Sequence, residues 1–177
     1  MRDLAGVDLG AQIRERLIAE LPEGYTMPSV LQKIADAGRY GLKTGRGYYR
    51  YEEGSRTPIP DADVTRMIEA VSAEKGIKRR HLDDATILER CLYALVNEGA
   101  RILEEKIAQR SADIDIIYLN GYGFPSYRGG PMFYADEIGV DRVYERVKSF
   151  HAEHGPWWTP APLLERLARD GGRFTDL

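Results

Sequence analysis

This 177-residue sequence contains an ungapped internal repeat, which limits the folds open to it. At a constant offset of 133 positions, the beginning of the chain matches its end with ten identities over about 36 positions. The identities include Asp3 with Asp136, Gly6 with Gly139, Val7 with Val140, Asp8 with Asp141, and Gly38 with Gly171. They gather where helices are expected to begin and end, positions at which backbone geometry restricts the choice of residue. The pattern therefore indicates a duplicated structural unit.

The repeat also predicts that the first copy is shorter than the second. The second copy begins near Thr86, and the same offset places the start of the first copy about 47 residues before Met1. We therefore expect the chain to begin inside a structural unit, as the C-terminal piece of something longer. The expected divisions are a truncated first helical copy at 1–51, a linker with a connecting helix at 52–85, and a second, degenerate helical copy at 86–177.

Hydrophobic periodicity predicts helices in both copies. The expected helices span residues 7–20, 29–37, about 84–109, 114–119, 131–137, 140–151 and 162–169, and a further one follows Asp61. A short extended strip is expected around Tyr49 and Tyr51, and no segment reads as a βαβ unit. The predicted fold class is all-α, with two tandem related helical units of which the first is truncated at its N-terminus.

Composition excludes several classes of function. The 25 basic and 28 acidic residues nearly balance, so we expect no nucleic acid as main partner, since no basic excess neutralises phosphates. The single cysteine, Cys91, cannot form an internal disulfide and indicates a reducing compartment. No apolar run approaches the roughly 18 residues of a membrane span, and no secretory signal follows Met1. We expect a cytoplasmic protein that is too short for a dinucleotide domain plus a substrate domain.

The long helix at 84–109 carries a candidate site residue in its apolar stripe. Leu88, Cys91, Leu95 and Ile102 are spaced so that Glu98 falls on the same face. A carboxylate facing a core must be paired or hydrogen-bonded. The interpretation we favour is a buried acid that holds backbone N–H groups of a nearby loop, and the alternative is a ligand contact or general base. Asn97 is expected to be a structural hydrogen-bonding residue, and Cys91 a packing residue.

Two loops hold the other candidates. The segment 121–131 combines four glycines, two prolines and three aromatics, but it lacks the dinucleotide fingerprint, so we favour tight packing between helices. Arg128 could still meet an anion there. In the turn at 41–47, Lys43 and Arg46 could touch a phosphate, although a solvated loop is favoured. The histidines at 151 and 154 lack further ligands, so no metal site is expected.

Longer strings of the sequence resemble one enzyme family over essentially the whole chain. They are DLAGVDLG, GRYGLKTGRGYYRY, ILERCLYALVNEGARILEE, DIDIIYLNGYGFPSYRGGPMFYAD and GPWWTPAPLLERLA. They are similar to the C-terminal region of 3-hydroxyacyl-CoA dehydrogenases, above all the multifunctional fatty-acid β-oxidation enzymes that also carry an enoyl-CoA hydratase domain. That region has two tandem helical domains in the family, the second a degenerate copy, which agrees with the repeat.

The resemblance implies a role without catalytic residues in this chain. The family's NAD-binding Rossmann domain, its catalytic His and Glu, and its hydratase domain have no counterpart in the sequence, so NAD is expected only in the parent enzyme. Met1 and Asp3 would belong to the stub of a substrate-facing loop, and the loop with Tyr127 and Arg128 would be its counterpart in the second copy. Expected partners are acyl-CoA through the parent enzyme, and the missing domains or a second copy of the chain. A eukaryotic source would imply the peroxisome.

Two further hypotheses stay open on the sequence alone. The chain could be a free-standing helical module that docks to a partner chain, because a truncated first copy should leave an apolar groove where its long helix belongs. It could also be an independent acyl-CoA binder. The main hypothesis remains the substrate-shaping and domain-packing or dimerising part of an L-3-hydroxyacyl-CoA dehydrogenase.

Overall fold

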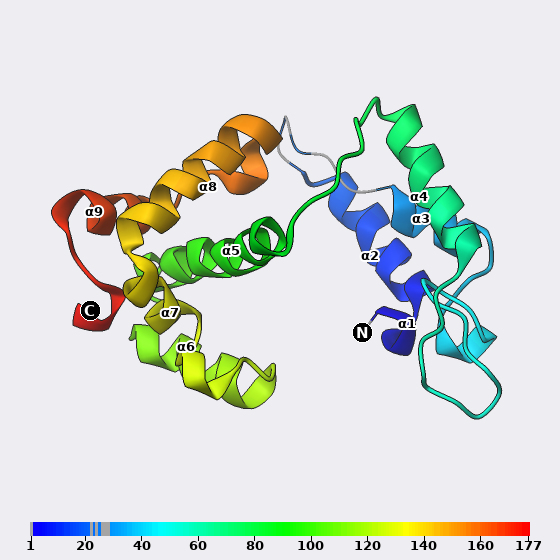
Figure 1. Ribbon diagram of the computed structural model, residues 1–177, viewed down its shortest axis with the longest axis horizontal. Coiled ribbons are helices and arrows are strands. Elements are labelled where there is room, and N and C mark those ends of the chain that lie inside the picture. Colours follow the sequence, from blue (N-terminus) through cyan, green and yellow to red (C-terminus); the bar gives the residue numbers. More distant parts are fainter. Residues whose placement is uncertain (1, 22, 24, 26–28) are drawn as a thin grey trace. The chain divides into compact units, whose positions relative to one another are not determined.

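The computed structural model describes residues 2–21, 23, 25 and 29–177, which form two compact units, 1–81 and 82–177 (Figure 1). Each unit is built of helices, and in the described part of the chain extended pairing is limited to isolated bridges. The class is all-α, as the periodicity predicts. No described helix is long and apolar enough to cross a membrane.

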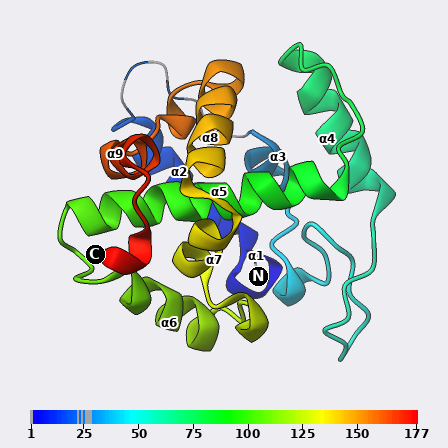
Figure 2. The same cartoon turned by 60° about the vertical axis from the view of Figure 1, so that its left-hand side comes forward.

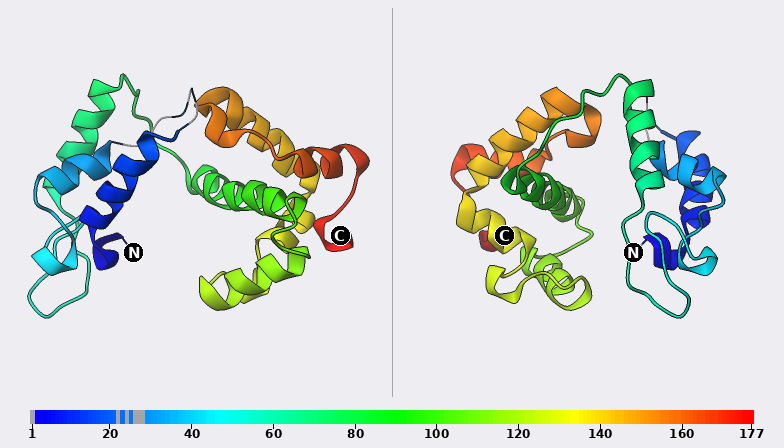
Figure 3. Two further views of the ribbon diagram at one scale, coloured as in Figure 1. Left: turned by 180° about the vertical axis from the view of Figure 1, so that it is seen from behind. Right: turned by 45° about the vertical axis from the view of Figure 1, so that its right-hand side comes forward.

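The first unit contains three longer helices and a looped segment. Its elements are α1 (Arg2–Ala5), α2 (Val7–Ile18), α3 (Val30–Asp36), the 3-10 turn η1 (Leu42–Thr44) and α4 (Ala62–Glu74). Helix α2 packs on α3, and α3 packs on α4. The small core consists of Val7, Ala11, Leu31, Ile34, Ala35 and Val64. The loop between η1 and α4 leaves the helices at one end of the unit, beside α1 (Figure 3), and three isolated bridges, the last between Arg50 and Ile59, hold it together.

The second unit is organised around one central helix. Its elements are α5 (Asp84–Glu104), α6 (Ser111–Gly121), η2 (Ser126–Arg128), α7 (Pro131–Ile138), α8 (Val140–His154), η3 (Pro156–Trp158), α9 (Pro162–Asp170) and η4 (Phe174–Asp176). Helix α5 runs through the unit with α6 and α7 on one side and α8 and α9 on the other (Figure 2). This arrangement encloses a larger core than that of the first unit.

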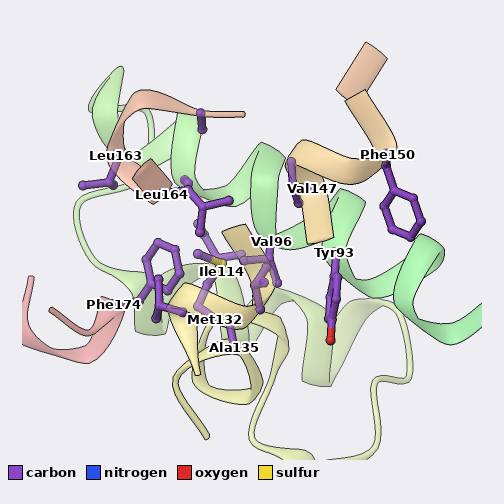
Figure 4. Packing of buried hydrophobic residues seen from close by; sticks show 14 residues of the cluster. Tyr93, Val96, Ile114, Met132, Ala135, Val147, Phe150, Leu163, Leu164 and Phe174 are labelled. Atoms are coloured by element: carbon purple, nitrogen blue, oxygen red, sulfur yellow. The ribbon is translucent and has the colours of Figure 1, made fainter. Parts of the chain in front are cut away.

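Local sequence explains where α5 begins, how closely it packs and where it ends. The Asp83 side chain caps it by accepting a hydrogen bond from the backbone N–H of Thr86 at 2.7 Å. Its inner face contributes Tyr93 and Val96 to the core shown in Figure 4. A side chain at Gly99 would lie 2.5 Å from the Met132 sulfur, so glycine permits the close contact between α5 and α7. The helix stops at 104, short of the expected 109, because a left-handed turn follows it, with φ 59° at position 106.

The sequence repeat is a structural repeat. Gly6 and Gly139 precede α2 and α8 with nearly the same backbone angles, φ 105° and ψ 122° against φ 99° and ψ 118°. Both angles lie in a region that only glycine adopts easily. Asp3 and Asp136 accept backbone hydrogen bonds in the same way, each carboxylate binding two successive N–H groups, those of 48 and 49 or of 174 and 175. The duplicated positions are therefore those that fix turns between helices.

The segment 52–85, expected to be a linker with a connecting helix, does contain a helix. Helix α4 belongs to the first unit, since Val64 lies in that unit's core and Asp61, at the helix N-cap, pairs with buried Arg39. The boundary between the two compact units falls between His81 and Leu82 in the sequence. Residues 78–83 are thus what connects the two units.

Candidate functional site

A cavity of about 810 Å³ opens in the first unit. Its walls come from α1, from the loop at 48–60 and from the beginning of α4. Three tyrosines, Tyr48, Tyr49 and Tyr51, line it together with apolar residues, and Arg2 and Arg56 bring positive charge to it. Its size is within the range of small-molecule sites.

Asp3 forms the polar centre of one wall. Its buried carboxylate accepts hydrogen bonds from the backbone N–H groups of Tyr48 and Tyr49 and from the Tyr51 hydroxyl, each at 3.0 Å. A side chain at Gly47 would lie 2.5 Å from the same carboxylate, so glycine is needed where this loop passes. The three donors leave Asp3 a structural acceptor that holds the tyrosine loop against α1.

Two of the cavity's tyrosines, Tyr48 and Tyr51, keep their protons. Burial, followed by the hydrogen bond to Asp3 and the charge of that carboxylate, raises the pKa of Tyr51 to about 12. Burial also raises the pKa of Tyr48. Both hydroxyls are therefore neutral at physiological pH, and the single hydroxyl proton of Tyr51 is donated to Asp3.

A buried ion pair fixes the other side of the cavity. Arg39 donates to the backbone oxygen of Gly47 at 2.9 Å and to the carboxylate of Asp61 at 2.5 Å. Asp61 also accepts the backbone N–H of Asp63, and the hydrogen bond from Arg39 holds the pKa of Asp61 below its usual range. The pair joins the loop to the start of α4. With Asp61 ion-paired and Asp3 hydrogen-bonded, the cavity offers tyrosine rings, apolar side chains and two cations, a chemistry suited to binding an anion with an apolar part.

Of the first unit's predicted residues that the structure describes, Asp3 lines this cavity, and Lys43 and Arg46 do not. Met1 lies outside the described residues. Asp3 lines the cavity, but as a buried acceptor. Lys43 pairs with Asp8 at 2.6 Å and lies 5.5 Å from the centre of the Tyr40 ring. Arg46 is exposed at the turn, where its backbone bridges to neighbouring segments.

Tyr127 and Arg128 lie in the second unit, on the η2 turn. Tyr127 is 81% exposed. The Arg128 guanidinium lies 5.4 Å from the centre of the Tyr127 ring and 5.6 Å from that of Tyr134. Such cation–π contacts hold an arginine in place without neutralising it. The loop thus presents an aromatic and cationic surface.

Helix α5 separates the two adjacent polar candidates. Asn97 is buried, donating to the backbone oxygen of Thr159 at 3.0 Å and accepting from the N–H of Ala161 at 2.8 Å. Glu98 is not buried: its side chain is 62% exposed and pairs with Arg101 at 3.5 Å. The prediction of a buried Glu98 was wrong because α5 carries two apolar stripes, and the core uses the one through Tyr93, not the one through Leu88.

The prediction that Cys91 packs in the core was wrong for the same reason, because Cys91 lies in the stripe through Leu88 and is exposed. Other structurally important residues were not predicted at all. Asp115 is buried and accepts the N–H groups of Met132 at 2.8 Å and Phe133 at 3.1 Å, which caps α7. The Arg39–Asp61 pair also went unpredicted, since nothing local links residues 22 positions apart. The role of Asp136 could have been predicted, because Asp136 matches Asp3 in the repeat. Among the described residues, no His, Cys, Asp and Glu side chains gather as a metal site.

Comparison with known proteins places both copies in one family. The family model of the 3-hydroxyacyl-CoA dehydrogenase C-terminal domain matches residues 1–51 and 87–175. The chain is 41% identical to a peroxisomal bifunctional enzyme of Danio rerio, with 97% of the chain and 26% of that protein covered. It is 32% identical to a fatty acid oxidation complex subunit alpha of Shewanella sp. (strain MR-4), over 97% of the chain and 24% of the subunit. The chain thus spans about a quarter of the length of these relatives.

A solved structure shows the same fold. The dehydrogenase part of a multifunctional enzyme from C. elegans superposes with a TM-score of 0.66 at 24% identity, over 93% of this chain and 37% of that one. The repeat, its helical architecture and the match of both copies agree. This chain belongs to the family of the 3-hydroxyacyl-CoA dehydrogenase C-terminal domain.

Proposed function

We propose that this chain is the C-terminal helical part of an NAD-dependent L-3-hydroxyacyl-CoA dehydrogenase of fatty-acid β-oxidation. The observation that carries the proposal is the match of both helical copies, residues 1–51 and 87–175, to that family's C-terminal domain. In the whole enzyme the substrate's C3 carbon gives a hydride to NAD, its hydroxyl loses a proton, and a 3-ketoacyl-CoA forms. The chain's part in this is to shape the acyl-CoA site and to hold domains together.

The hydride acceptor belongs to another domain. A dinucleotide site requires a strand, a glycine-rich turn and a helix in succession, and the described residues offer only isolated bridges. We therefore propose that NAD binds to a part of the enzyme outside residues 1–177. The buried carboxylates Asp3 and Asp115 hold backbone N–H groups, so neither is placed as a general base.

Support for a substrate-shaping role comes from the cavity of the first unit. Tyrosine hydroxyls and apolar walls face it, and Arg2 and Arg56 add positive charge, which suits a thioester chain with an anionic carrier. Support for a packing role comes from exposed apolar side chains, among them Leu9, Ile13 and Leu88. The second candidate function is a helical module that docks to a partner chain, and the exposed side chains of Leu9 and Ile13 favour it. The named relatives include peroxisomal enzymes, so a eukaryotic source would place the protein there.

Complementation tests the proposal. The Danio rerio relative, shortened by the quarter that this chain matches, is assayed for NADH formation from L-3-hydroxybutyryl-CoA with and without the present chain. We expect no turnover from residues 1–177 alone and recovery when the two are combined or fused. Turnover by the chain alone at the roughly 10 s⁻¹ typical of enzymes would contradict the proposal, as would a fused protein that folds but stays inactive.

A further inference from the structure

Residues 75–83 join α4 to α5 without forming a helix (Figure 1). Every residue from 75 to 81 is exposed to solvent. Three consecutive basic residues, Lys78, Arg79 and Arg80, lie in this segment, and Arg79 forms an exposed ion pair with Glu69 at 2.6 Å. Such a pair is weak in water, so it does not fix the main chain. The segment therefore presents a run of basic side chains on exposed backbone.

The main chain at Lys78 and Arg79 is accessible as well. The end of α4 is closed by the N–H of Ile77, which donates to the backbone oxygen of Ser72 at 2.8 Å. Beyond it, neither Lys78 nor Arg79 exchanges a hydrogen bond with a backbone group of the described residues. Proteolytic cleavage concentrates at exposed chain whose backbone is not hydrogen-bonded, because a protease binds its substrate as an extended strand. This segment meets that requirement without prior unfolding.

Basic residues in other loops lie on main chain that is held in place. Arg50 exchanges both backbone hydrogen bonds with Ile59, each at 2.9 Å. The N–H groups of Lys106 and Arg128 each donate to the backbone oxygen three residues earlier, at 3.1 and 2.9 Å. Residues 22–28 contain no Lys or Arg. A protease that cleaves after basic residues is therefore expected to act first between α4 and α5.

A cut in this segment leaves both units intact. The buried core cluster of the first unit lies within 7–64 and that of the second within 93–174. Helix α4 ends before the basic residues, and Asp83, whose side chain caps α5, stays on the side of the second unit. Neither core has to open for the backbone to enter a protease, so local accessibility alone sets the rate of cleavage.

We propose that Lys78, Arg79 and Arg80 form a cleavage site for a serine protease of trypsin-like specificity, which divides the chain into its two units while both stay folded. Such a protease holds the basic side chain that precedes the cleaved bond in a pocket with a carboxylate. Water is the only co-reactant: the carbonyl carbon takes its oxygen and becomes a carboxylate, and the nitrogen takes its two hydrogens and becomes an ammonium group. The proposal does not rest on the dehydrogenase role.

Limited digestion of the full chain tests the proposal. Residues 1–177 are treated with a small amount of trypsin, and the intact masses of the products are followed with time. We expect the first products to be two complementary fragments that divide after residue 78, 79 or 80, with the helicity of the mixture by circular dichroism unchanged. First cuts after Arg50, Lys106 or Arg128 would overturn the proposal, as would a loss of helicity that accompanies the first cut.

A pair of variants with equal charge assigns the effect to this segment. The combined variant Lys78→Gln, Arg79→Gln and Arg80→Gln should lose its intact mass about tenfold more slowly than the original, because cleavage must then await an opening of folded chain. The matched control combines Arg46→Gln, Arg56→Gln and Arg128→Gln, three exposed arginines of other loops, and should be cleaved at the original rate. Equal rates for the two variants would overturn the proposal.

Discussion

The two units share one device for turning the chain and differ in what surrounds it. In both, an aspartate accepts two successive backbone N–H groups and a glycine with φ near 100° leads into the next helix. The second unit adds the long helix α5 and has a core of fourteen buried residues, whereas the core of the first unit has six among the described residues. The turn is therefore specified locally, whereas the larger core is built around the central helix.

The first unit compensates with polar contacts. Its loop at 41–60 is fixed by Asp3 and by the buried pair of Arg39 with Asp61. Helix α4 adds Val64 to the core of the first unit. We therefore expect the first unit to depend on charge and the second on apolar burial.

Removing the same leucine from each core should give the largest effect. Leu31 and Leu164 are a matched pair of the repeat, 7% and 0% exposed. We expect Leu164→Ala to destabilise the second unit by about 4 kcal/mol and Leu31→Ala to destabilise the first by about 2, because a partly open core relaxes around the loss. Both tryptophans, Trp157 and Trp158, lie in the second unit, so urea unfolding followed by their fluorescence reports that unit alone.

Circular dichroism follows both units together and supplies the other half of this measurement. Leu31→Ala should shift the circular-dichroism transition and leave the tryptophan transition in place. A tryptophan transition that moves equally in both variants would mean that the units unfold as one, and the comparison would fail.

Removing the shared aspartate should cost each unit a similar, smaller amount. Asp3→Ala and Asp136→Ala each leave two backbone N–H groups without their acceptor, and we expect a loss of about 1–3 kcal/mol in the unit concerned. Urea unfolding with the same two probes measures it. The control is Asp170→Ala, an exposed aspartate paired with its neighbour Arg169, which should change stability by less than about 0.5 kcal/mol. A large loss from only one of the two aspartates would show that the repeat preserved sequence but not role.

Lowering the pH should destabilise the two units to different extents, and we expect this difference in stability to be smaller than the effects above. The hydrogen bond from Arg39 lowers the folded-state pKa of Asp61, so Asp61 stabilises the first unit above its unfolded pKa, and that contribution is lost as the pH falls through the lowered value. Burial raises the pKa of Asp115, so its ionisation opposes folding of the second unit and protonation relieves that cost. Between pH 5 and pH 3 the first unit should weaken more than the second.

Thermal unfolding across that range, with both probes, measures the difference. Asp61→Asn should remove most of the first unit's extra acid sensitivity, because the titrating partner of Arg39 is gone. An Asp61→Asn chain with the acid sensitivity of the original would assign the effect to another carboxylate.

The structural features that could be predicted from the sequence were those that are local or duplicated. The helices and the Gly6 and Gly139 turns were predictable because spacing and backbone geometry act over a few residues. The Tyr48–Asp3 contact and the pair of Arg39 with Asp61 were not, since they join distant positions through a loop whose course no local pattern fixes. The cavity they frame was therefore missed, although Asp3 was a candidate residue.

The smallest expected effect on stability concerns two adjacent residues of α5, Glu98 and Asn97. Replacing each by alanine should give clearly different losses of stability. Glu98→Ala should change stability by no more than about 0.5 kcal/mol, since its carboxylate is exposed and its pair with Arg101 is 3.5 Å long. Asn97→Ala is the comparison: it leaves the Ala161 N–H without its acceptor and should cost about 1–3 kcal/mol in the tryptophan transition. If Glu98→Ala cost as much as Asn97→Ala, the buried stripe of α5 would pass through Leu88 and Glu98, and the core around Tyr93 would be misassigned.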